Sequence, residues 1–330
     1  MIRSVRFSRS LPLLLGALLV TGGLAACGSD DDEPAADEGR RLDSPVTIEH
    51  QFGTTTIDTV PERVVTLDLQ WTDVMLAMGV EPVAYAVDSL MPESGVPWQE
   101  VPAGAKKLSL DDGVPVEEII ALDPDLVLGS WYIPDKETYD LLAAQVPTVA
   151  APPDEKVVPW QELVRTAGEF LADPATAERI IDETESKISA VAAELPGLKD
   201  KSFLLAQYIV GDSMYIVADE EDGSSSFFQA LGMKLYQPVL EEGRRTGQTR
   251  LNVSTERADL LRSDLLVFLV NGGDESNLAD IPGFDQLPGT VAVFDYATIV
   301  GLNTPSPLSL PYSLEQLRPY LEKAAGGAGA

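Results

Sequence analysis

Aromatic side chains at the ends of predicted strands are the residues best placed for chemistry, and that chemistry is noncovalent binding. Ligands of open parallel sheets bind beyond the carboxyl ends of the strands. Aromatic rings suit a bulky ligand that has both apolar and polar parts. We expect the loop at residues 303–308 to line the same site. The candidate contacts are Trp71, Tyr85, Trp131, Tyr132, Tyr208, Asn271 and Tyr296, each with packing under a loop as the alternative.

A group of arginines offers charge to such a site. Arg244, Arg245 and Arg250 cluster in a predicted loop that contains glycine. A guanidinium group forks onto carboxylate or catecholate oxygens, so Arg244 and Arg245 are candidate ligand contacts. A solvated loop without a ligand is the alternative.

Residues for catalysis or metal binding are sparse. His50 is the only histidine and Cys27 the only cysteine, whereas transition-metal sites need clusters of such residues. Ser130 is not part of a Gly-x-Ser-x-Gly nucleophile elbow, because Trp131 and Tyr132 follow it, and no Gly-Lys-Ser/Thr phosphate loop is present. We therefore expect a binding protein and not an enzyme, with no metal or cofactor of its own.

The first 26 residues have the features of an export signal. Arg3, Arg6 and Arg9 precede an apolar run that is too short for a mature transmembrane helix. Leu24-Ala25-Ala26-Cys27 then resembles a bacterial lipobox, which predicts lipidation of Cys27 and a membrane anchor on the extracytoplasmic face. An ordinary signal peptide followed by an unmodified thiol is the alternative.

An acidic stalk and an acidic folded part are expected after this leader. Residues 27–44 are rich in Gly, Ser, Asp, Glu, Pro and Ala, which predicts a flexible tether. The leader carries three arginines and no acid, so its removal changes the formal charge from −30 to −33. Such a charge argues against nucleic acid as a partner. It serves solubility, with attraction of cationic ligands as a sharper alternative.

Strands that alternate with helices predict βα units and mainly parallel sheets. A hairpin is expected first, from Val46 to Gln51 and from Thr54 to Asp58. We assign an N-terminal α/β lobe to residues 45–172, a linker helix to 173–195 and a C-terminal α/β lobe to 196–325. Residues 326–330 are expected to be a disordered tail.

The linker helix has clear boundaries in the sequence. Asp173 is a natural N-cap, Pro174 suits the first helical position, and Pro196-Gly197 ends the helix. About twenty residues at about 1.5 Å each give a rod of roughly 30 Å. One face is charged, and the other is formed by Ala177, Ile181, Thr184, Ile188, Val191 and Leu195.

The two predicted lobes share a repeated unit. Residues 117–128 align with residues 256–267 at a constant offset, as a helix, a tight turn, an aspartate and a buried strand. Glu117 then matches Glu256, and Asp125 matches Asp264. The repeat supports two related lobes joined by the linker helix.

The combined pattern resembles the iron-siderophore and vitamin B12 group of ABC-transporter substrate-binding proteins, over about residues 46–321. The resemblance rests on residues 57–67, 78–84 and 116–128, on the linker helix and on Ser254-Thr255-Glu256. It implies the class III substrate-binding fold, in which one rigid helix joins two α/β lobes and ligand lies in the cleft between them. It also implies a monomer that captures a ferric siderophore and delivers it to an ABC permease with its ATPase.

The resemblance also assigns roles to particular residues. Trp131 and Tyr132 correspond to an aromatic contact of hydroxamate-siderophore binders, and Glu117 and Glu256 to acidic residues that dock on the permease. Hydroxamate binders carry an arginine before the helix that precedes the Pro-Asp strand. This chain departs from them, because it has Asp111-Asp112 at that position. This departure favours a neutral or cationic complex such as a ferrioxamine. Haem or cobalamin as ligand, and a surface or sensory lipoprotein outside transport, are the alternatives.

Overall fold

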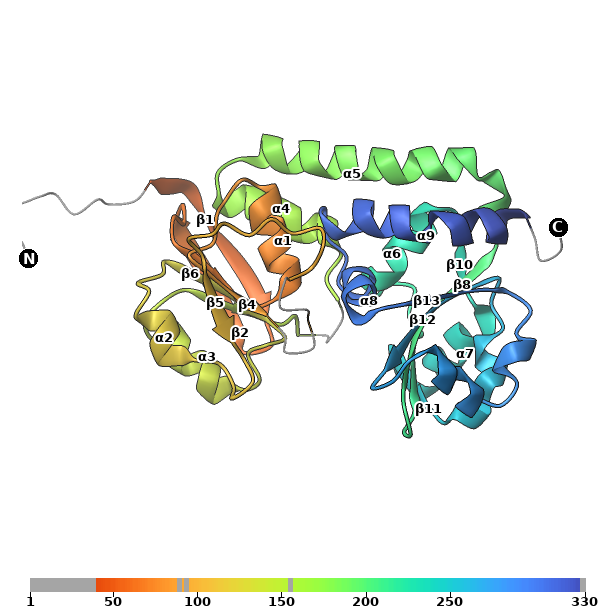
Figure 1. Ribbon diagram of the computed structural model, residues 1–330. Helices are drawn as coiled ribbons and strands as arrows, with labels where there is room; N and C mark the ends of the chain where they lie inside the picture. Colours follow the sequence, from red (N-terminus) through yellow and green to blue (C-terminus); the bar gives the residue numbers. More distant parts are fainter. Residues whose placement is uncertain (1–39, 88–90, 92–94, 154–156, 327–330) are drawn as a thin grey trace, which may run out of the picture. The chain divides into compact units, whose positions relative to one another are not determined.

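The computed structural model describes residues 40–87, 91, 95–153 and 157–326. Figure 1 shows these residues as two α/β lobes with a long helix, α5. The predicted export signal, Cys27 and most of the predicted stalk lie outside the described residues. None of the described helices has both the length and the apolar character needed to cross a bilayer.

The N-terminal lobe contains a five-stranded sheet in which all neighbouring strands are parallel. The strand order is β5-β4-β3-β6-β7, so the chain order reverses at β3. A separate antiparallel hairpin precedes this sheet, as predicted. Its strands and those of the sheet are β1 (Arg41–His50), β2 (Gly53–Thr59), β3 (Val64–Thr66), β4 (Ala84–Val87), β5 (Lys106–Ser109), β6 (Leu126–Ser130) and β7 (Thr148–Ala150).

The C-terminal lobe contains a mixed sheet of order β11-β9-β8-β12-β13, with the short β10 also paired to β8. β8, β12 and β13 are parallel, whereas β9 is antiparallel to both β8 and β11. This lobe therefore opens with a hairpin and not with a βα unit. The strands are β8 (Ser202–Ile209), β9 (Met214–Val217), β10 (Lys234–Leu235), β11 (Arg250–Val253), β12 (Leu265–Asn271) and β13 (Thr290–Phe294).

The helices pack on these sheets and on one another. Four belong to the N-terminal lobe, and α5 follows them. They are α1 (Leu69–Ala77), α2 (Val116–Ile120), α3 (Lys136–Ala143), α4 (Trp160–Phe170), α5 (Pro174–Glu194), α6 (Gly223–Ala230), α7 (Gln237–Thr246), α8 (Tyr296–Asn303) and α9 (Ser309–Gly326). Short 3₁₀ segments are η1 (Pro196–Leu198), η2 (Thr255–Leu261), η3 (Glu275–Asp280) and η4 (Phe284–Gln286).

The α5 helix forms as its sequence predicts and joins the two lobes. The Asp173 carboxylate accepts a hydrogen bond from the Thr176 N–H at 3.1 Å, and Pro174 occupies the first turn. The predicted apolar face is buried from Ala177 to Val191, and it also includes Ile180. α5 packs against α4 of the N-terminal lobe and against α6 and α9 of the C-terminal lobe.

The repeated unit has the same structural role in both lobes. In the N-terminal lobe, the Asp125 carboxylate accepts hydrogen bonds from the N–H groups of Glu62 and Arg63, just before β3. In the C-terminal lobe, Asp264 accepts from the N–H of Ser202 at 2.8 Å, at the start of β8. Each aspartate thus fixes the beginning of the strand beside its own, which gives the sequence repeat a physical basis.

The structure corrects several boundaries. β1 begins at Arg41, so the last residues assigned to the stalk pair with β2, and Leu42 packs on the core. α9 extends to Gly326, the first residue assigned to the tail. The predicted loop around Arg244 is the helix α7, which carries Pro238 in its first turn and ends at Gly247 with φ of 72°. These are ordinary helix boundary signals, obscured by the charged residues and glycine between them.

Candidate functional site

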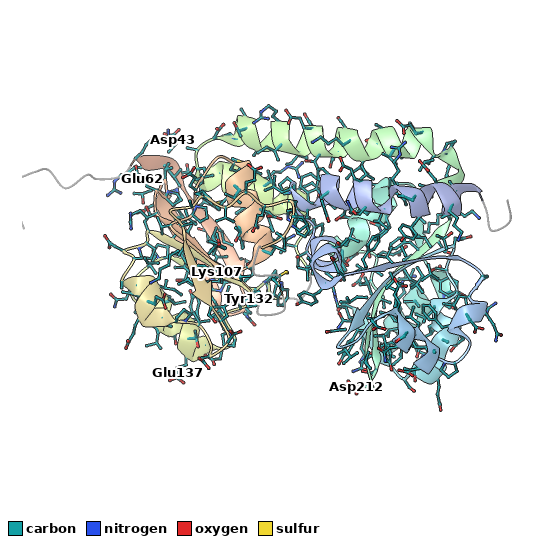
Figure 2. All side chains as sticks on the ribbon, in the orientation of Figure 1. Asp43, Glu62, Lys107, Tyr132, Glu137 and Asp212 are labelled. Atoms are coloured by element: carbon teal, nitrogen blue, oxygen red, sulfur yellow. The ribbon has the colours of Figure 1, made fainter. Side chains whose placement is uncertain are left out.

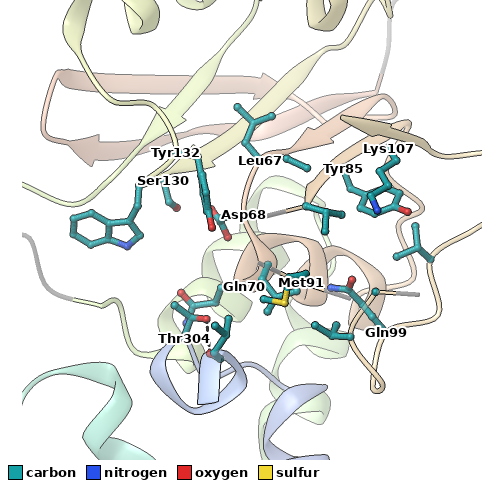
Figure 3. A pocket seen from close by; sticks show the side chains of 18 of the residues that line it. Leu67, Asp68, Gln70, Tyr85, Met91, Gln99, Lys107, Ser130, Tyr132 and Thr304 are labelled. Carbon is teal, nitrogen blue, oxygen red and sulfur yellow. Dashed lines mark hydrogen bonds between the residues drawn. The ribbon is translucent and has the colours of Figure 1, made fainter. Parts of the chain in front are cut away.

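A pocket of about 460 Å³ opens at the carboxyl ends of the parallel strands of the N-terminal lobe. Leu67 and Asp68 follow β3, Tyr85 and Lys107 come from β4 and β5, and Ser130 ends β6. Figures 2 and 3 show this region, with Lys107 and Tyr132 labelled in both views. Ligands of open parallel sheets bind beyond the carboxyl ends of the strands, near the point where the strand order reverses. The pocket lies at this position.

The C-terminal lobe contributes one wall of the pocket. Val300 and Thr304 of this wall belong to α8 and to its C-cap. The loop after α8 is fixed to α1, because the Gln70 amide donates a hydrogen bond to the Pro305 carbonyl oxygen at 2.6 Å. Part of the predicted 303–308 loop therefore lines the pocket, as expected.

An aromatic pair forms the exposed edge of the pocket. Trp131 and Tyr132 are 39% and 37% exposed, and both line the pocket. They follow Ser130, whose φ of 35° turns the chain out of β6 at a register shift. Ile133 is buried beneath this turn against Gly129, which anchors the loop. Apolar rings held on an anchored loop can bury area against a ligand without much ordering of the loop.

Asp68 is the buried charged group of the pocket. It is the N-cap of α1 and 6% exposed, and its Oδ1 accepts a hydrogen bond from the Trp71 N–H at 2.8 Å. Among the described residues, no donor completes a hydrogen bond to Oδ2. Burial raises the pKa of Asp68 to about 6, although the Trp71 N–H, the nearby Ser130 hydroxyl and the Gln70 N–H act in the opposite direction.

A second buried carboxylate, Asp73 of α1, holds the pocket wall together. Its Oδ1 accepts from the Gln99 amide at 2.6 Å, and its Oδ2 accepts from the Trp98 indole at 2.9 Å and from the Ser306 hydroxyl at 2.5 Å. Burial raises the pKa of Asp73 to about 7, while these three donors lower it and the charge of Asp68 raises it further. Asp73 thereby connects α1 to the Gln99 segment that lines the pocket and to the loop after α8.

The structure brings some of the predicted ligand contacts together and separates others. Tyr85, Trp131 and Tyr132 line the pocket. Trp71 does not: it is 2% exposed and packs on Phe170, with ring centroids 6.2 Å apart. The sequence contained this signal, because Trp71, Val74 and Met75 recur at helical spacing and share the buried face of α1.

The predicted contacts of the C-terminal lobe lie outside this pocket. Tyr208 is buried at the end of β8, where its hydroxyl oxygen accepts a hydrogen bond from the Gly211 N–H. Asn271 ends β12, and Tyr296 begins α8 and is partly buried. None of these three residues is among those that line the pocket.

Arg244 and Arg245 are also separated from the pocket. They lie in the last turn of α7 and pair with Glu220 and Glu242, at 3.0 and 2.7 Å. Arg250 instead lies in β11 and pairs with the buried Asp222 at 3.3 Å. The predicted loop is wrong, because Arg244 and Arg245 lie on a helix and Arg250 on a strand, and none of the three lines the pocket.

No group of three or more metal-binding side chains occurs in the part of the chain that the structure describes. His50 ends β1, where its Nε2 lies 3.1 Å from the Thr55 hydroxyl and its ring packs on Tyr139. Burial lowers the pKa of His50. The histidine is thus a packed strand residue, as the sequence indicated.

Sequence reasoning missed Gln99 and Lys107 of the pocket, and it gave Asp68 no role. Lys107 lies in β5, an edge strand with one buried residue, Leu108, and so with little apolar pattern. Gln99 lies in a segment without regular structure. Asp68 had a signal, because it directly follows a predicted strand at the edge where ligands bind.

The fold and the pocket together define a substrate-binding protein, and the chain belongs to the periplasmic binding protein family, which matches residues 64–280. The probable siderophore-binding lipoprotein YfiY of Bacillus subtilis (strain 168) is 26% identical over 220 residues, an alignment that spans 65% of each chain. A periplasmic solute binding protein of Mycobacterium smegmatis str. MC2 155 has a similar structure, with a TM-score of 0.70 and 28% identity over 86% of this chain and 100% of that chain.

A further solved structure shares the fold. PiaA of Streptococcus pneumoniae TIGR4, in complex with ferrichrome, superimposes with a TM-score of 0.70 and 24% identity, over 86% of this chain and all of that chain. These similarities confirm the predicted family and the two α/β lobes joined by a long helix. The named relatives are binding proteins, which agrees with the prediction that the chain is not an enzyme.

Proposed function

We propose that this protein captures a ferric siderophore in the pocket at the carboxyl ends of β3 to β6. The observation that carries the proposal is an aromatic-edged pocket, with Trp131 and Tyr132 at its mouth, in a member of the periplasmic binding protein family. The name of YfiY and the ferrichrome complex of PiaA support a siderophore as the ligand class. Iron enters as cargo, and the protein holds no cofactor of its own.

The protein acts outside the cytoplasmic membrane, anchored through lipidated Cys27, and delivers its cargo as a monomer to an ABC permease with its ATPase. The lipobox at residues 24–27 supports the lipid anchor. The name of YfiY, a probable siderophore-binding lipoprotein, supports an anchored protein that takes part in siderophore uptake.

Ligand titration monitored by tryptophan fluorescence tests the proposed cargo. The protein contains 4 tryptophans, of which Trp131 lies at the pocket. We expect saturable quenching by a ferric hydroxamate at sub-micromolar concentration, and weaker quenching by the metal-free siderophore. Ferric citrate, a ferric catecholate, haem and cobalamin complete the panel. Quenching by haem or cobalamin alone would replace the siderophore with the alternative ligand, and no response to any compound would contradict the proposal.

Docking on the permease is proposed to use Glu117 and Glu256, one in each lobe. Both are exposed in the first turn of the helical segment that precedes the matched strands β6 and β12. We expect Glu117→Lys or Glu256→Lys to reduce uptake of the ferric complex severalfold while its Kd for the isolated protein stays unchanged. Glu137→Lys, at an exposed position on α3, is the matched control. Unchanged uptake by the double variant would contradict this assignment.

A further inference from the structure

Gln99 lines the pocket with a carboxamide group that is held in one orientation. Its Nε2 donates a hydrogen bond to Asp73 Oδ1 at 2.6 Å. The other carboxylate oxygen of Asp73 is occupied by two further donors, the Trp98 indole and the Ser306 hydroxyl. An ionised carboxylate can only accept hydrogen bonds, so the NH₂ group of Gln99 has to face Asp73. The carboxamide oxygen of Gln99 therefore lies on the side away from Asp73.

This oxygen, Gln99 Oε1, is available to a ligand. Gln99 is partly buried, and no described residue donates a hydrogen bond to Oε1. The fully buried side-chain atoms without a partner in the described part of the chain are Asp68 Oδ2 and Ser313 Oγ, so Gln99 Oε1 is not shut off from the pocket as they are. A group bound in the pocket can therefore reach it.

Gln70 repeats the arrangement on the same wall of the pocket (Figure 3). Its Nε2 donates to the carbonyl oxygens of Pro305 and Val158, at 2.6 and 3.3 Å. Both partners can only accept, which fixes this second carboxamide in the same sense. The wall formed by Gln70 and Gln99 therefore offers hydrogen-bond acceptors to a ligand, while its NH₂ groups are used within the protein.

We propose that Gln99 determines specificity by accepting a hydrogen bond from an N–H group of the bound ferric complex, and that Asp73 is the positioning residue that fixes the orientation of Gln99. This contact rests on the proposed function, and it adds the ligand group that is selected. Secondary amide N–H groups beside the iron centre of a hydroxamate siderophore are donors of this kind. A ligand that placed a carbonyl or carboxylate oxygen at Gln99 would leave two acceptors facing each other, which lowers affinity.

Asp73→Asn should reverse the polarity that Gln99 presents to the pocket. The carboxamide oxygen of the asparagine can accept from Trp98 and Ser306, so its NH₂ group replaces the oxygen that Gln99 contacts. That NH₂ group needs an acceptor, and Gln99 supplies one when its carboxamide turns over. The pocket then meets the NH₂ group of Gln99, and a ligand N–H group faces a second donor.

Two ferric complexes with the same iron centre test the proposal at pH 8. Ferrioxamine E carries secondary amide N–H groups, and a synthetic analogue methylated at those nitrogens has none. We expect the wild-type protein to bind ferrioxamine E about 10-fold more tightly than the methylated analogue. Asp73→Asn and Gln99→Met should each reduce this preference to less than about 3-fold. Gln145→Met, at an exposed glutamine outside the pocket, is the matched control and should keep the full preference.

The pH dependence of the preference gives a second readout. Burial raises the pKa of Asp73 to about 7, so this group is mostly ionised at pH 8 and protonated at pH 5. A protonated Oδ1 donates to Gln99 as the asparagine does, so the wild-type preference for ferrioxamine E should weaken at pH 5. Asp73→Asn should show no such change. This variant keeps Asp68, whose charge acts on Asp73, and the exposed Glu100 and Lys107 of the pocket, so the comparison isolates Asp73.

The outcomes separate this contact from the proposed function. If the wild-type protein binds both complexes equally well, or if Asp73→Asn and Gln99→Met keep the full preference, the contact is wrong and siderophore capture stands. The same conclusion follows if another ferric siderophore binds and ferrioxamine E does not. If no ferric siderophore binds, the proposed function fails and the contact fails with it.

Discussion

Replacement of Asp73 by alanine is expected to lower the free energy of unfolding by about 3 to 5 kcal/mol. The change would leave the Trp98 indole, the Gln99 amide and the Ser306 hydroxyl without their shared acceptor. Ser306 is fully buried and cannot turn to water without local opening. Chemical denaturation followed by circular dichroism measures the loss.

Asp73→Asn is the matched control for this prediction. Its carboxamide oxygen can accept from Trp98 and Ser306, and its NH₂ group can donate to Gln99 once the Gln99 amide flips. The network then survives without a buried charge. We expect this variant to be about as stable as the wild-type protein at pH 5, where the wild-type Asp73 is protonated.

The pH dependence of the free energy of unfolding should show whether Asp73 is protonated or ionised in the native protein. Burial raises the pKa of Asp73 to about 7 and that of Asp68 to about 6, from an ordinary value of 3.8. The native state therefore binds more protons than the unfolded state between about pH 4 and pH 7, so stability decreases as the pH rises through this window. For Asp73 alone, this loss of stability amounts to about 4 kcal/mol.

Asp73→Asn should therefore be more stable than the wild-type protein at pH 8, and its stability should change less between pH 5 and pH 8. An unchanged slope in the variant would show that Asp73 does not titrate in this window. A variant as unstable as Asp73→Ala at pH 5 would show that the amide cannot replace the carboxylate in the network.

Replacement of Trp131 by alanine is expected to weaken binding of the ferric complex by about 10- to 100-fold. Buried aromatic anchors at an interface cost about 2 kcal/mol or more when truncated. Trp131 is 39% exposed, so a ligand can bury the rest of the ring. Isothermal titration calorimetry gives the Kd without relying on the fluorescence of the residue removed.

Two controls accompany the prediction for Trp131→Ala. The melting temperature of Trp131→Ala should change little, because Ile133, and not Trp131, anchors the loop. Leu141→Ala, on α3, removes a residue that is 55% exposed and lies outside the pocket, and it should leave the Kd unchanged. If Trp131→Ala binds the ferric complex with wild-type affinity, Trp131 does not contact the ligand, and the ligand binds elsewhere.

Elements whose signals come from neighbouring residues could be predicted from the sequence. The N-cap, first-turn proline and apolar spacing of α5 depend on neighbouring residues, and the helix occurs where they predict it. The repeat around Asp125 and Asp264 was visible because the same unit occurs in both lobes. Trp131 and Tyr132 were found because parallel strands bring their carboxyl ends to one edge of a sheet.

Which polar groups are buried together, and which aromatic residues face the pocket, depends on contacts between segments that are distant in sequence. Asp73 meets Trp98 and Ser306, which lie far along the chain, so no local pattern could predict its network or its raised pKa. Arg244 lies outside the pocket for a related reason, because it belongs to α7 and pairs with Glu220. Local spacing specifies helices and strands, whereas burial and charge depend on contacts between segments that the folded chain brings together.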